Sequence, residues 1–305
     1  MSIVERALEK TKDAVDRSRG QVDQLRAADL RPGAAKTPQV GEGPARRQTT
    51  SPTSQLEEPQ TTIDLDPSKL FEAGLVTDSD HTLRLRDEFR RLKWPLMEAA
   101  QGSRSPGGGQ DRLIMVGSAV PGEGKTFVSF NLAMALADER DSTVVLIDAD
   151  IAKPRLTHSL GLLEHAGLAD FLADDSLTIR DVLVGTSIPN LRVVPAGRFN
   201  THAPELIGSL RMRELLSQLD ESCALPTMLF DSSPLLVTNA GQVLSGLVGQ
   251  IVMVVRADST PQSAVTEALS MLRKSAAVGL VLNQSRPTLG SHLYGEYYGY
   301  SRERE

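Results

Sequence analysis

The sequence predicts an α/β protein whose sheet is mainly parallel and carries helices on both faces. Three observations lead to this prediction. Short apolar runs alternate with segments whose apolar residues recur at helical spacing, which is typical of a parallel sheet. One run leads into a glycine-rich loop that ends in Gly-Lys-Thr, and two others end in aspartate. The 305 residues have an apolar content of 40%, which is enough for one core of ordinary size.

The composition argues against some classes of function. The formal net charge is −6 and only 4% of the residues are aromatic, which disfavours nucleic-acid binding. Cys223 is the single cysteine, so no disulfide can form within the chain, and a reducing cytoplasm fits best. No apolar run is long enough to span a bilayer and no signal peptide opens the sequence. We therefore expect a cytoplasmic protein whose membrane contact comes through a partner or a surface helix.

The first part of the chain predicts a helix followed by a linker. In residues 1–28, Leu8, Val15 and Val22 recur at a spacing of seven residues. This pattern is typical of a partner-binding helix and equally of a solvated helix with a thin apolar stripe. Residues 29–79 are rich in Pro, Gly, Ser, Thr and Gln, so we expect a disordered linker there.

The folded domain, expected over residues 80–290, begins with a basic helix. The segment Asp80–Ala100 carries leucines and a phenylalanine among arginines and a lysine. Pro95 should kink this helix or end one segment of it. The helix is expected to pack on the core or on a neighbouring subunit, and a merely solvated charged face is the alternative.

The loop between the strand Leu113–Val116 and the helix Phe127–Ala137 matches a phosphate-binding motif. It departs from the Walker A pattern G-x-x-x-x-G-K-[ST] only at Ala119, where a methyl group is tolerated. Its glycines allow backbone N–H groups to face an anion, and the next helix adds its positive end. A glycine-rich turn without a ligand is the alternative. The residues expected to contact the nucleotide here are Val120, Pro121, Gly122, Glu123, Gly124, Lys125, Thr126 and Phe127.

Two further strands end in acidic residues. The run Thr143–Ile147 leads into Asp148 and Asp150, and a second run leads into Asp231 in the manner of a Walker B motif. The carboxyl ends of parallel strands border the ligand crevice of an α/β sheet. We expect Mg²⁺ to be held by Thr126, with Asp150 and Asp231 directly or through water. Each aspartate is alternatively a helix cap.

The remaining elements continue the alternation of strands and helices. Asn283 follows the last expected strand and is predicted either to contact the adenine or to cap that strand. The expected elements are short helices and loops over 162–183, a strand and turn over 191–197, a helix over 204–219, a strand over 248–256, a helix over 262–275 and a strand over 277–283.

The last residues, 291–305, predict a flexible tail because glycines and charged residues interrupt any periodic pattern. All four tyrosines of the chain lie here, and none lies in the expected core. Tyrosines that only filled a core would be spread along the sequence. Their crowding indicates sites of phosphorylation, and a partner-docking segment is the alternative. The four residues are Tyr294, Tyr297, Tyr298 and Tyr300.

Taken together, these motifs resemble the bacterial tyrosine kinases, the autokinases of exopolysaccharide and capsule assembly, over roughly residues 80–305. The opening residues 1–10 are similar to the subgroup found with exosortase gene clusters. The resemblance implies a P-loop fold of the partition-ATPase type. It rests on the segments 119–126, 146–150 and 229–234 and on the tail tyrosines.

The chain departs from the family pattern at two places. The family usually carries an arginine two residues after the second aspartate, where this chain has Ala152 followed by Lys153. The helix ahead of the core carries, in the family, an acid-x-x-Arg-x-x-Arg pattern used in ring assembly. This chain offers Asp87, Arg90 and Lys93 there. A homo-oligomer is nevertheless expected from the resemblance.

The resemblance implies ATP-dependent autophosphorylation of the tail tyrosines of a neighbouring subunit. Lys125 and Mg²⁺ would neutralise the transferred group, and Asp148 would accept or orient the tyrosine proton. Asp150 and Asp231 complete the catalytic set.

As partners, the resemblance implies a membrane polysaccharide co-polymerase of the chain-length type as activator, which would recruit the kinase to the inner face of the membrane, and a cognate tyrosine phosphatase. One alternative is an ATP-switched positioning or scaffold ATPase. Such ATPases carry a signature lysine where this chain has Val120. Another is an inactive regulator that binds a membrane partner through residues 1–27.

Overall fold

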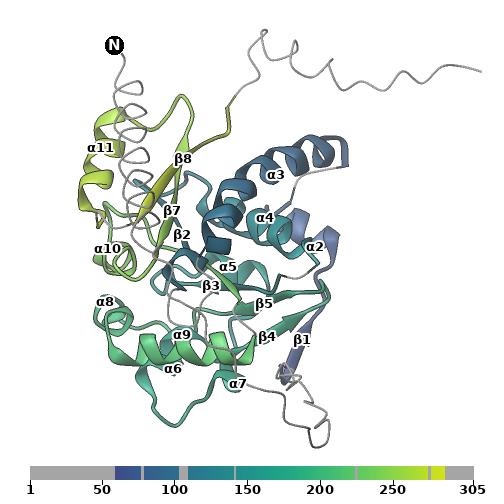
Figure 1. The fold of residues 1–305 in the computed structure, drawn as a ribbon, viewed down its shortest axis with the longest axis vertical. Coiled ribbons are helices and arrows are strands. Elements are labelled where there is room, and N and C mark those ends of the chain that lie inside the picture. The colour runs from purple at the N-terminus through teal and green to yellow at the C-terminus, as the bar shows by residue number, and fades with distance from the viewer. Residues whose placement is uncertain are drawn as a thin grey trace, which may run out of the picture. The chain divides into compact units, whose positions relative to one another are not determined.

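A single mixed sheet with helices packed on both faces organises the protein, as the computed structural model shows (Figure 1). The chain divides after Pro52 into two units, and every described residue belongs to the second. The helix expected over residues 1–28 and the four tail tyrosines lie outside the described residues. The structure describes residues 59–76, 79–102, 109–140, 142–223, 226–273 and 276–285.

The described strands form an eight-stranded sheet in the order β1-β4-β5-β3-β6-β2-β7-β8. Every pairing is parallel except that between β4 and β5, so the predicted α/β class with a mainly parallel sheet is confirmed. The strands are β1 (Thr61–Ile63), β2 (Leu113–Ser118), β3 (Val144–Asp148), β4 (Val184–Thr186), β5 (Leu191–Val194), β6 (Thr227–Asp231), β7 (Gln250–Arg256) and β8 (Ala277–Asn283).

Alternate residues of the central strands enter two separate apolar cores, one on each face of the sheet. Ile114 and Val116 pack into the first core, and Met115 packs into the second, because successive side chains of a strand point to opposite faces. The first core is covered by α2 (Pro67–Glu72), α3 (Ser79–Gly102), α4 (Lys125–Ala137) and α5 (Arg155–Ser159). The second is covered by α6 (Leu168–Ala173), α7 (Ile179–Val182), α8 (Ala203–Ile207), α9 (Leu210–Ser222), α10 (Asn239–Leu244) and α11 (Gln262–Met271).

The register of the central strands brings the functional motifs to one edge of the sheet. β3 and β6 pair so that Asp148 lies opposite Asp231, and β2 pairs with β6 so that Val116 also lies opposite Asp231. The phosphate loop begins directly after β2. The carboxyl ends of three neighbouring strands therefore carry the loop and the acidic residues, as a parallel sheet requires.

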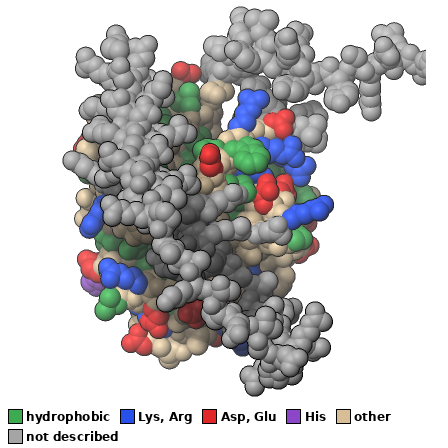
Figure 2. Space-filling model, in the orientation of Figure 1, with side chains coloured by type: hydrophobic (Ala, Val, Ile, Leu, Met, Phe, Trp, Pro, Cys, Tyr) green, Lys and Arg blue, Asp and Glu red, His purple; other side chains and the backbone are tan. Residues whose placement is uncertain are grey.

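Helix α3 packs on the core of its own chain. Phe89 and Leu96 are buried, and Lys93 is buried as well. The Nζ atom of Lys93 donates hydrogen bonds to Glu139 Oε1 at 2.6 Å and to the Ala135 carbonyl at 2.9 Å. Over α3, basic and acidic side chains lie next to one another on the outer surface (Figure 2). Lys93 therefore holds α3 against α4 and does not extend the charged outer surface.

Two expectations about the helices, those over 204–219 and 262–275, need correction, and the outcomes for Pro95 and for membrane insertion can be reported. α3 continues without a break through Pro95, so the proline does not end the helix. The helix expected over 204–219 is two helices, because the side chain of Ser209 caps a new helix by accepting a hydrogen bond from Met212 N. α11 stops at Met271, four residues before the expected end. Within the described ranges, no helix has both the length and the apolar character needed to cross a membrane.

The prediction of a disordered linker is wrong for its last part, residues 59–76, which contain a strand and a helix. β1 pairs in parallel with β4, and α2 follows it with Pro67 at its first position. Asp66 caps α2, since its Oδ1 accepts a hydrogen bond from Ser68 N at 2.8 Å. This segment is short and polar, and it is ordered by pairing with a strand far along the chain, which local composition does not reveal.

Candidate functional site

The loop between β2 and α4 has the backbone of a phosphate cradle. Gly122 and Gly124 have φ angles of 84° and 94°, in the left-handed region that favours glycine. A Cβ atom on Gly124 would clash with the side-chain amide of Asn283, so this position is closed to other residues. α4 begins at Lys125, two residues ahead of the apolar pattern that predicted it, and its amino end faces the cradle.

A buried glutamate inside the loop holds this conformation. Glu123 Oε2 accepts a hydrogen bond from Val120 N at 2.8 Å, which closes the loop on itself. Glu123 Oε1 accepts one from Thr260 Oγ1 at 2.6 Å, and the Glu123 carbonyl accepts one from Asn283 Nδ2 at 2.8 Å. Glu123 is only 1% exposed. The loop is therefore tied to the segments after β7 and at the end of β8, and Glu123 does not itself face the cavity.

Lys125 and Thr126 stand at the start of α4 and line the cavity. Lys125 is buried, and this burial lowers the pKa of its ammonium group, while the carboxylates of Asp231 and Asp150 oppose the shift. Phe127 also lines the cavity and packs on Phe89 with ring centroids 6.3 Å apart. The loop residues in the cavity wall are Pro121, Gly122, Gly124, Lys125, Thr126 and Phe127, whereas Val120 and Glu123 lie behind it.

Asp231 lies behind Thr126 at the end of β6 and is almost completely buried. Its carboxylate accepts hydrogen bonds from the side chains of Thr126 and Ser129, the latter at 3.1 Å. Burial raises the pKa of Asp231 to about 6, while the Thr126 hydrogen bond and the charge of Lys125 oppose this shift. The predicted grouping of Thr126, Lys125 and Asp231 is present in the structure.

Asp148 and Asp150 occupy different environments although they are two residues apart. Asp148 is fully buried, and its Oδ2 accepts hydrogen bonds from Thr157 N at 2.8 Å and Thr157 Oγ1 at 2.7 Å. Burial and the neighbouring Asp231 raise the pKa of Asp148 to about 8. Asp148 is absent from the cavity wall, so the expected contact with a tyrosine hydroxyl is not favoured by this geometry. Its observed contacts anchor α5.

Asp150 is the carboxylate of the three that lines the cavity. Its Oδ1 accepts hydrogen bonds from Ser233 Oγ at 3.0 Å and from Lys153 N at 3.3 Å. Burial raises the pKa of Asp150, while the Ser233 hydrogen bond and the charge of Lys125 oppose the shift. A carboxylate with a raised pKa at a cavity wall is a stronger base than a solvated one.

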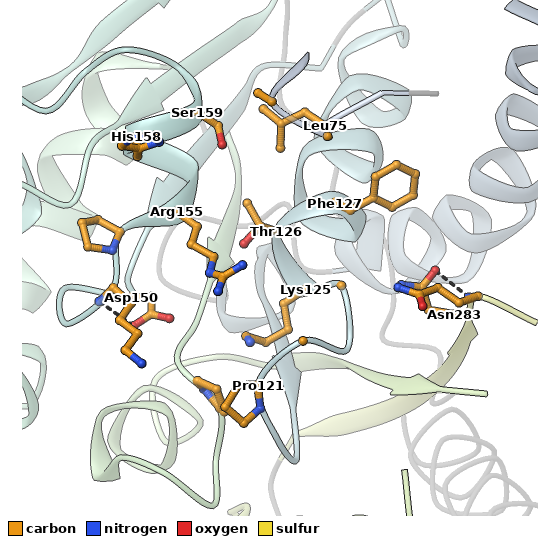
Figure 3. A pocket seen from close by; sticks show the side chains of 18 of the residues that line it. Leu75, Pro121, Lys125, Thr126, Phe127, Asp150, Arg155, His158, Ser159 and Asn283 are labelled. Atoms are coloured by element: carbon orange, nitrogen blue, oxygen red, sulfur yellow. Dashed lines mark hydrogen bonds between the residues drawn. The ribbon is translucent and has the colours of Figure 1, made fainter. Parts of the chain in front are cut away.

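The cavity holds about 1270 Å³ and is bordered by the phosphate loop, α5, the end of β8 and the segment between α2 and α3 (Figure 3). Typical small-molecule sites occupy about 300–1,000 Å³. The cavity therefore has room for a nucleotide and for part of a second reactant. Asn283 lines the cavity, and its amide nitrogen donates a hydrogen bond to the Glu123 carbonyl, so it supports the loop.

The donor set fits Mg²⁺ bound jointly with phosphates. Among the described residues, no group of three or more His, Cys, Asp or Glu side chains is arranged to hold a metal ion. Mg²⁺ usually keeps several waters and takes only one or two carboxylates together with substrate phosphates. The hydroxyl of Thr126, next to Asp231 and the cradle, meets that requirement.

Sequence reasoning missed two residues of the site. Arg155 points into the cavity from α5 in Figure 3, toward Lys125 and Thr126. Ser233 fixes Asp150. The local signals were the Pro154-Arg155 pair after one acidic strand and the serines after the other, but neither pattern indicates by itself which way a side chain points.

The fold and the site define a class: a P-loop protein in which two neighbouring strands on one side of the phosphate cradle, β3 and β6, end in acidic residues. No protein-family model matches the chain. The chain is 31% identical over 193 residues to the tyrosine-protein kinase YwqD of Bacillus subtilis, covering 62% of this chain and 78% of YwqD. It belongs to the bacterial tyrosine-protein kinases. This assignment does not favour the alternative of a positioning ATPase without kinase activity.

Longer relatives match over a similar share of the chain. Identity is 30% to the tyrosine-protein kinase wzc of Salmonella typhimurium, over 64% of this chain and 27% of wzc. It is 29% to the succinoglycan biosynthesis transport protein ExoP of Rhizobium meliloti, over 70% of this chain and 28% of ExoP. The chain thus spans about a quarter of the length of these two relatives.

Solved structures agree with the fold. The kinase domain of VpsO is similar with a TM-score of 0.56 and 25% identity, covering 69% of this chain and all of that domain. The kinase domain of the Escherichia coli tyrosine kinase ETK has a TM-score of 0.55 at 24% identity, covering 70% of this chain and 80% of that domain. The P-loop fold expected from the sequence is confirmed.

Proposed function

We propose that this protein uses ATP to phosphorylate its own C-terminal tyrosines, Tyr294, Tyr297, Tyr298 and Tyr300, in exopolysaccharide or capsule assembly. The observation that carries the proposal is the convergence of the phosphate loop and Asp150 on one cavity, with Asp231 directly behind Thr126, in a member of the tyrosine-protein kinases. The printed name of the relative ExoP refers to succinoglycan biosynthesis, which supports the polysaccharide role.

ATP binds with its phosphates on the loop Val120–Thr126. The backbone N–H groups of the loop and the start of α4 surround the phosphates, and Lys125 reaches the outer ones. Leu85, Phe127 and Leu282 line the same cavity and offer apolar contact to the adenine ring.

Thr126 and Asp231 would hold Mg²⁺ together with the bound phosphates, and Asp150 would contact it through water. The metal would supply positive charge that offsets the charge of the phosphates. Both protein groups are preset, because Asp231 is fixed by hydrogen bonds from Thr126 and Ser129.

In the transfer, the bond between the terminal phosphorus and the bridging oxygen of ADP breaks, and the tyrosine oxygen forms the new bond. The tyrosine proton passes to Asp150 Oδ2, since Oδ1 is occupied by Ser233 and Lys153 N. The ordinary pKa of tyrosine is about 10, so a positioned base assists the reaction. Lys125 neutralises charge that develops on the transferred group.

The acceptor is the tail of a neighbouring subunit in a homo-oligomer. Of the three α3 residues that match the family's ring-assembly pattern, Lys93 is buried and forms an ion pair with Glu139. Asp87 and Arg90 remain at the surface, where they form an ion pair with each other at 3.4 Å. By family resemblance, a membrane polysaccharide co-polymerase recruits and activates the kinase at the inner face of the membrane, and a cognate phosphatase reverses the modification.

The test is a phosphotyrosine assay on the purified full chain with ATP and Mg²⁺, with and without membrane fragments. Lys125→Met should abolish labelling, and its matched control Lys69→Met, an exposed lysine of α2, should not. Replacing the four tail tyrosines by Phe should remove the label and leave nucleotide binding intact. Nucleotide binding without any tyrosine labelling, in every setting, would overturn the proposal.

A further inference from the structure

The cavity wall that faces the phosphate loop carries a guanidinium group with no role so far. Arg155 is the first residue of α5, directly after the turn that follows Asp150. It lines the cavity, and Figure 3 shows its guanidinium directed toward Lys125 and Thr126. A second positive charge thus stands across the space where the phosphates would lie.

Arg155 has no partner of its own in the part of the chain that the structure describes. Its guanidinium forms no ion pair and no hydrogen bond there. Lys153 differs, because it lies beside Asp150 and its charge acts on that carboxylate. Burial is the main cause that lowers the pKa of Lys125, and the charge of Arg155 acts in the same direction. Two cations that face each other without an anion between them repel, and a bound phosphate would relieve this repulsion.

We propose that Arg155 binds the terminal phosphate of ATP together with Lys125. This inference rests on the proposed function, because it takes ATP as the ligand. A guanidinium offers paired N–H donors that match two oxygens of one phosphate, which a lysine cannot do. The cradle amides and Lys125 hold the phosphates from the loop, and Arg155 holds the terminal phosphate from the opposite wall. Arg155 therefore distinguishes ATP from ADP.

The experiment compares the binding of ADP and of a non-hydrolysable ATP analogue, each with Mg²⁺, to the full chain by calorimetry. Arg155→Met should weaken binding of the analogue about 10-fold or more, because a charge-assisted hydrogen bond is lost. ADP affinity should change by less than about 3-fold. Arg155→Lys should give an intermediate affinity for the analogue, since a lysine keeps the positive charge but lacks the paired N–H donors of a guanidinium.

The matched control is Arg213→Met, an exposed arginine of α9 outside the cavity wall, which should leave both affinities unchanged. Because Arg155 is exposed, both variants should melt within about 2 °C of the wild type, which checks folding. Equal losses for ADP and the analogue, or no loss for either, would overturn the assignment. Should the wild type bind the analogue through Arg155 yet never label tyrosine, the kinase proposal falls and this inference stands. If the wild type binds neither nucleotide, both fall.

Discussion

The two walls of the cavity are built in different ways. The loop wall, residues 120–127, is closed by an internal hydrogen bond and tied to two other segments, and its Glu123 and Lys125 are buried. The α5 wall, residues 152–159, is more exposed and includes Arg155, whose guanidinium has no partner in the described structure. Its main anchor is the pair of hydrogen bonds from Thr157 to Asp148.

This difference separates two tasks within one site. A cradle for phosphates stabilises charge best when its donors are fixed before the ligand arrives, and the hydrogen bonds of Glu123 provide that fixation. A wall that also has to admit an acceptor tyrosine is better left open. We therefore expect changes to the loop wall to cost more than similar changes to the α5 wall.

The largest effect is expected from Asp231→Asn, which removes the charge behind the loop wall. Phosphoryl transfer to the tail should slow about 100-fold or more, because the buried carboxylate that would hold Mg²⁺ together with Thr126 is lost. Single-turnover labelling with radioactive ATP measures this rate. Asp138→Asn, at the exposed end of α4, is the control and should not change it. If Arg155→Met slowed transfer more than Asp231→Asn, the ranking of the two walls would be reversed.

The next effect is expected from Glu123→Gln. The amide can accept at one oxygen only, so either Val120 N or Thr260 Oγ1 then faces another donor. A buried hydrogen bond left unmade costs about 1–3 kcal/mol. The melting temperature should therefore fall by about 2–12 °C, and nucleotide affinity should fall about 10-fold as the cradle loosens. Glu267→Gln, on the exposed side of α11, should change neither quantity. An unchanged affinity would show that the loop keeps its nucleotide-binding conformation without the full set of Glu123 hydrogen bonds.

How much of this site the sequence could predict depends on how far apart the contacting residues lie along the chain. The strand, loop and helix around Lys125 and the aspartates at strand ends follow from local patterns, and all were predicted. The role of Glu123 was not, because its partner Thr260 lies 137 residues away. β1 was missed for the same reason, since its pairing with β4 is remote. The orientation of Arg155 depends on the hydrogen bonds by which Thr157 anchors α5 to Asp148. The spacing of residues in the sequence does not predict these bonds.

A third prediction concerns Asp148, which contacts α5, and Asp231, which contacts the start of α4. The two carboxylates lie opposite each other on β3 and β6. In the folded protein without Mg²⁺, the pKa of Asp148 is raised to about 8 by burial and by Asp231. Between its usual pKa of 3.8 and about 8, the unfolded chain therefore binds fewer protons than the folded protein. Stability should fall as the pH rises through this window.

The measurement is the melting temperature in EDTA at several pH values. We expect a decrease of about 3 °C or more between mildly acidic and mildly alkaline buffer. Asp148→Asn should flatten this dependence, and Asp138→Asn should leave it as in the wild type. A melting temperature that rises with pH over the same range would contradict the assignment and would mean that the pair is stabilised in its charged form.

The smallest effect is expected from Asn283→Ala, which removes one outer support of the loop wall. Loss of the hydrogen bond to the Glu123 carbonyl should cost about 1 kcal/mol, which lowers the melting temperature by about 2–4 °C. Binding of ATP and of GTP should weaken equally, by about 3-fold, because the change acts through the loop. A direct contact to adenine would instead reduce the preference for ATP over GTP and leave GTP affinity unchanged. Asn239→Ala, at the exposed start of α10, is the matched control. Nucleotide selectivity therefore distinguishes the adenine contact that the sequence left open for Asn283 from loop support, and the hydrogen bond to the Glu123 carbonyl favours loop support.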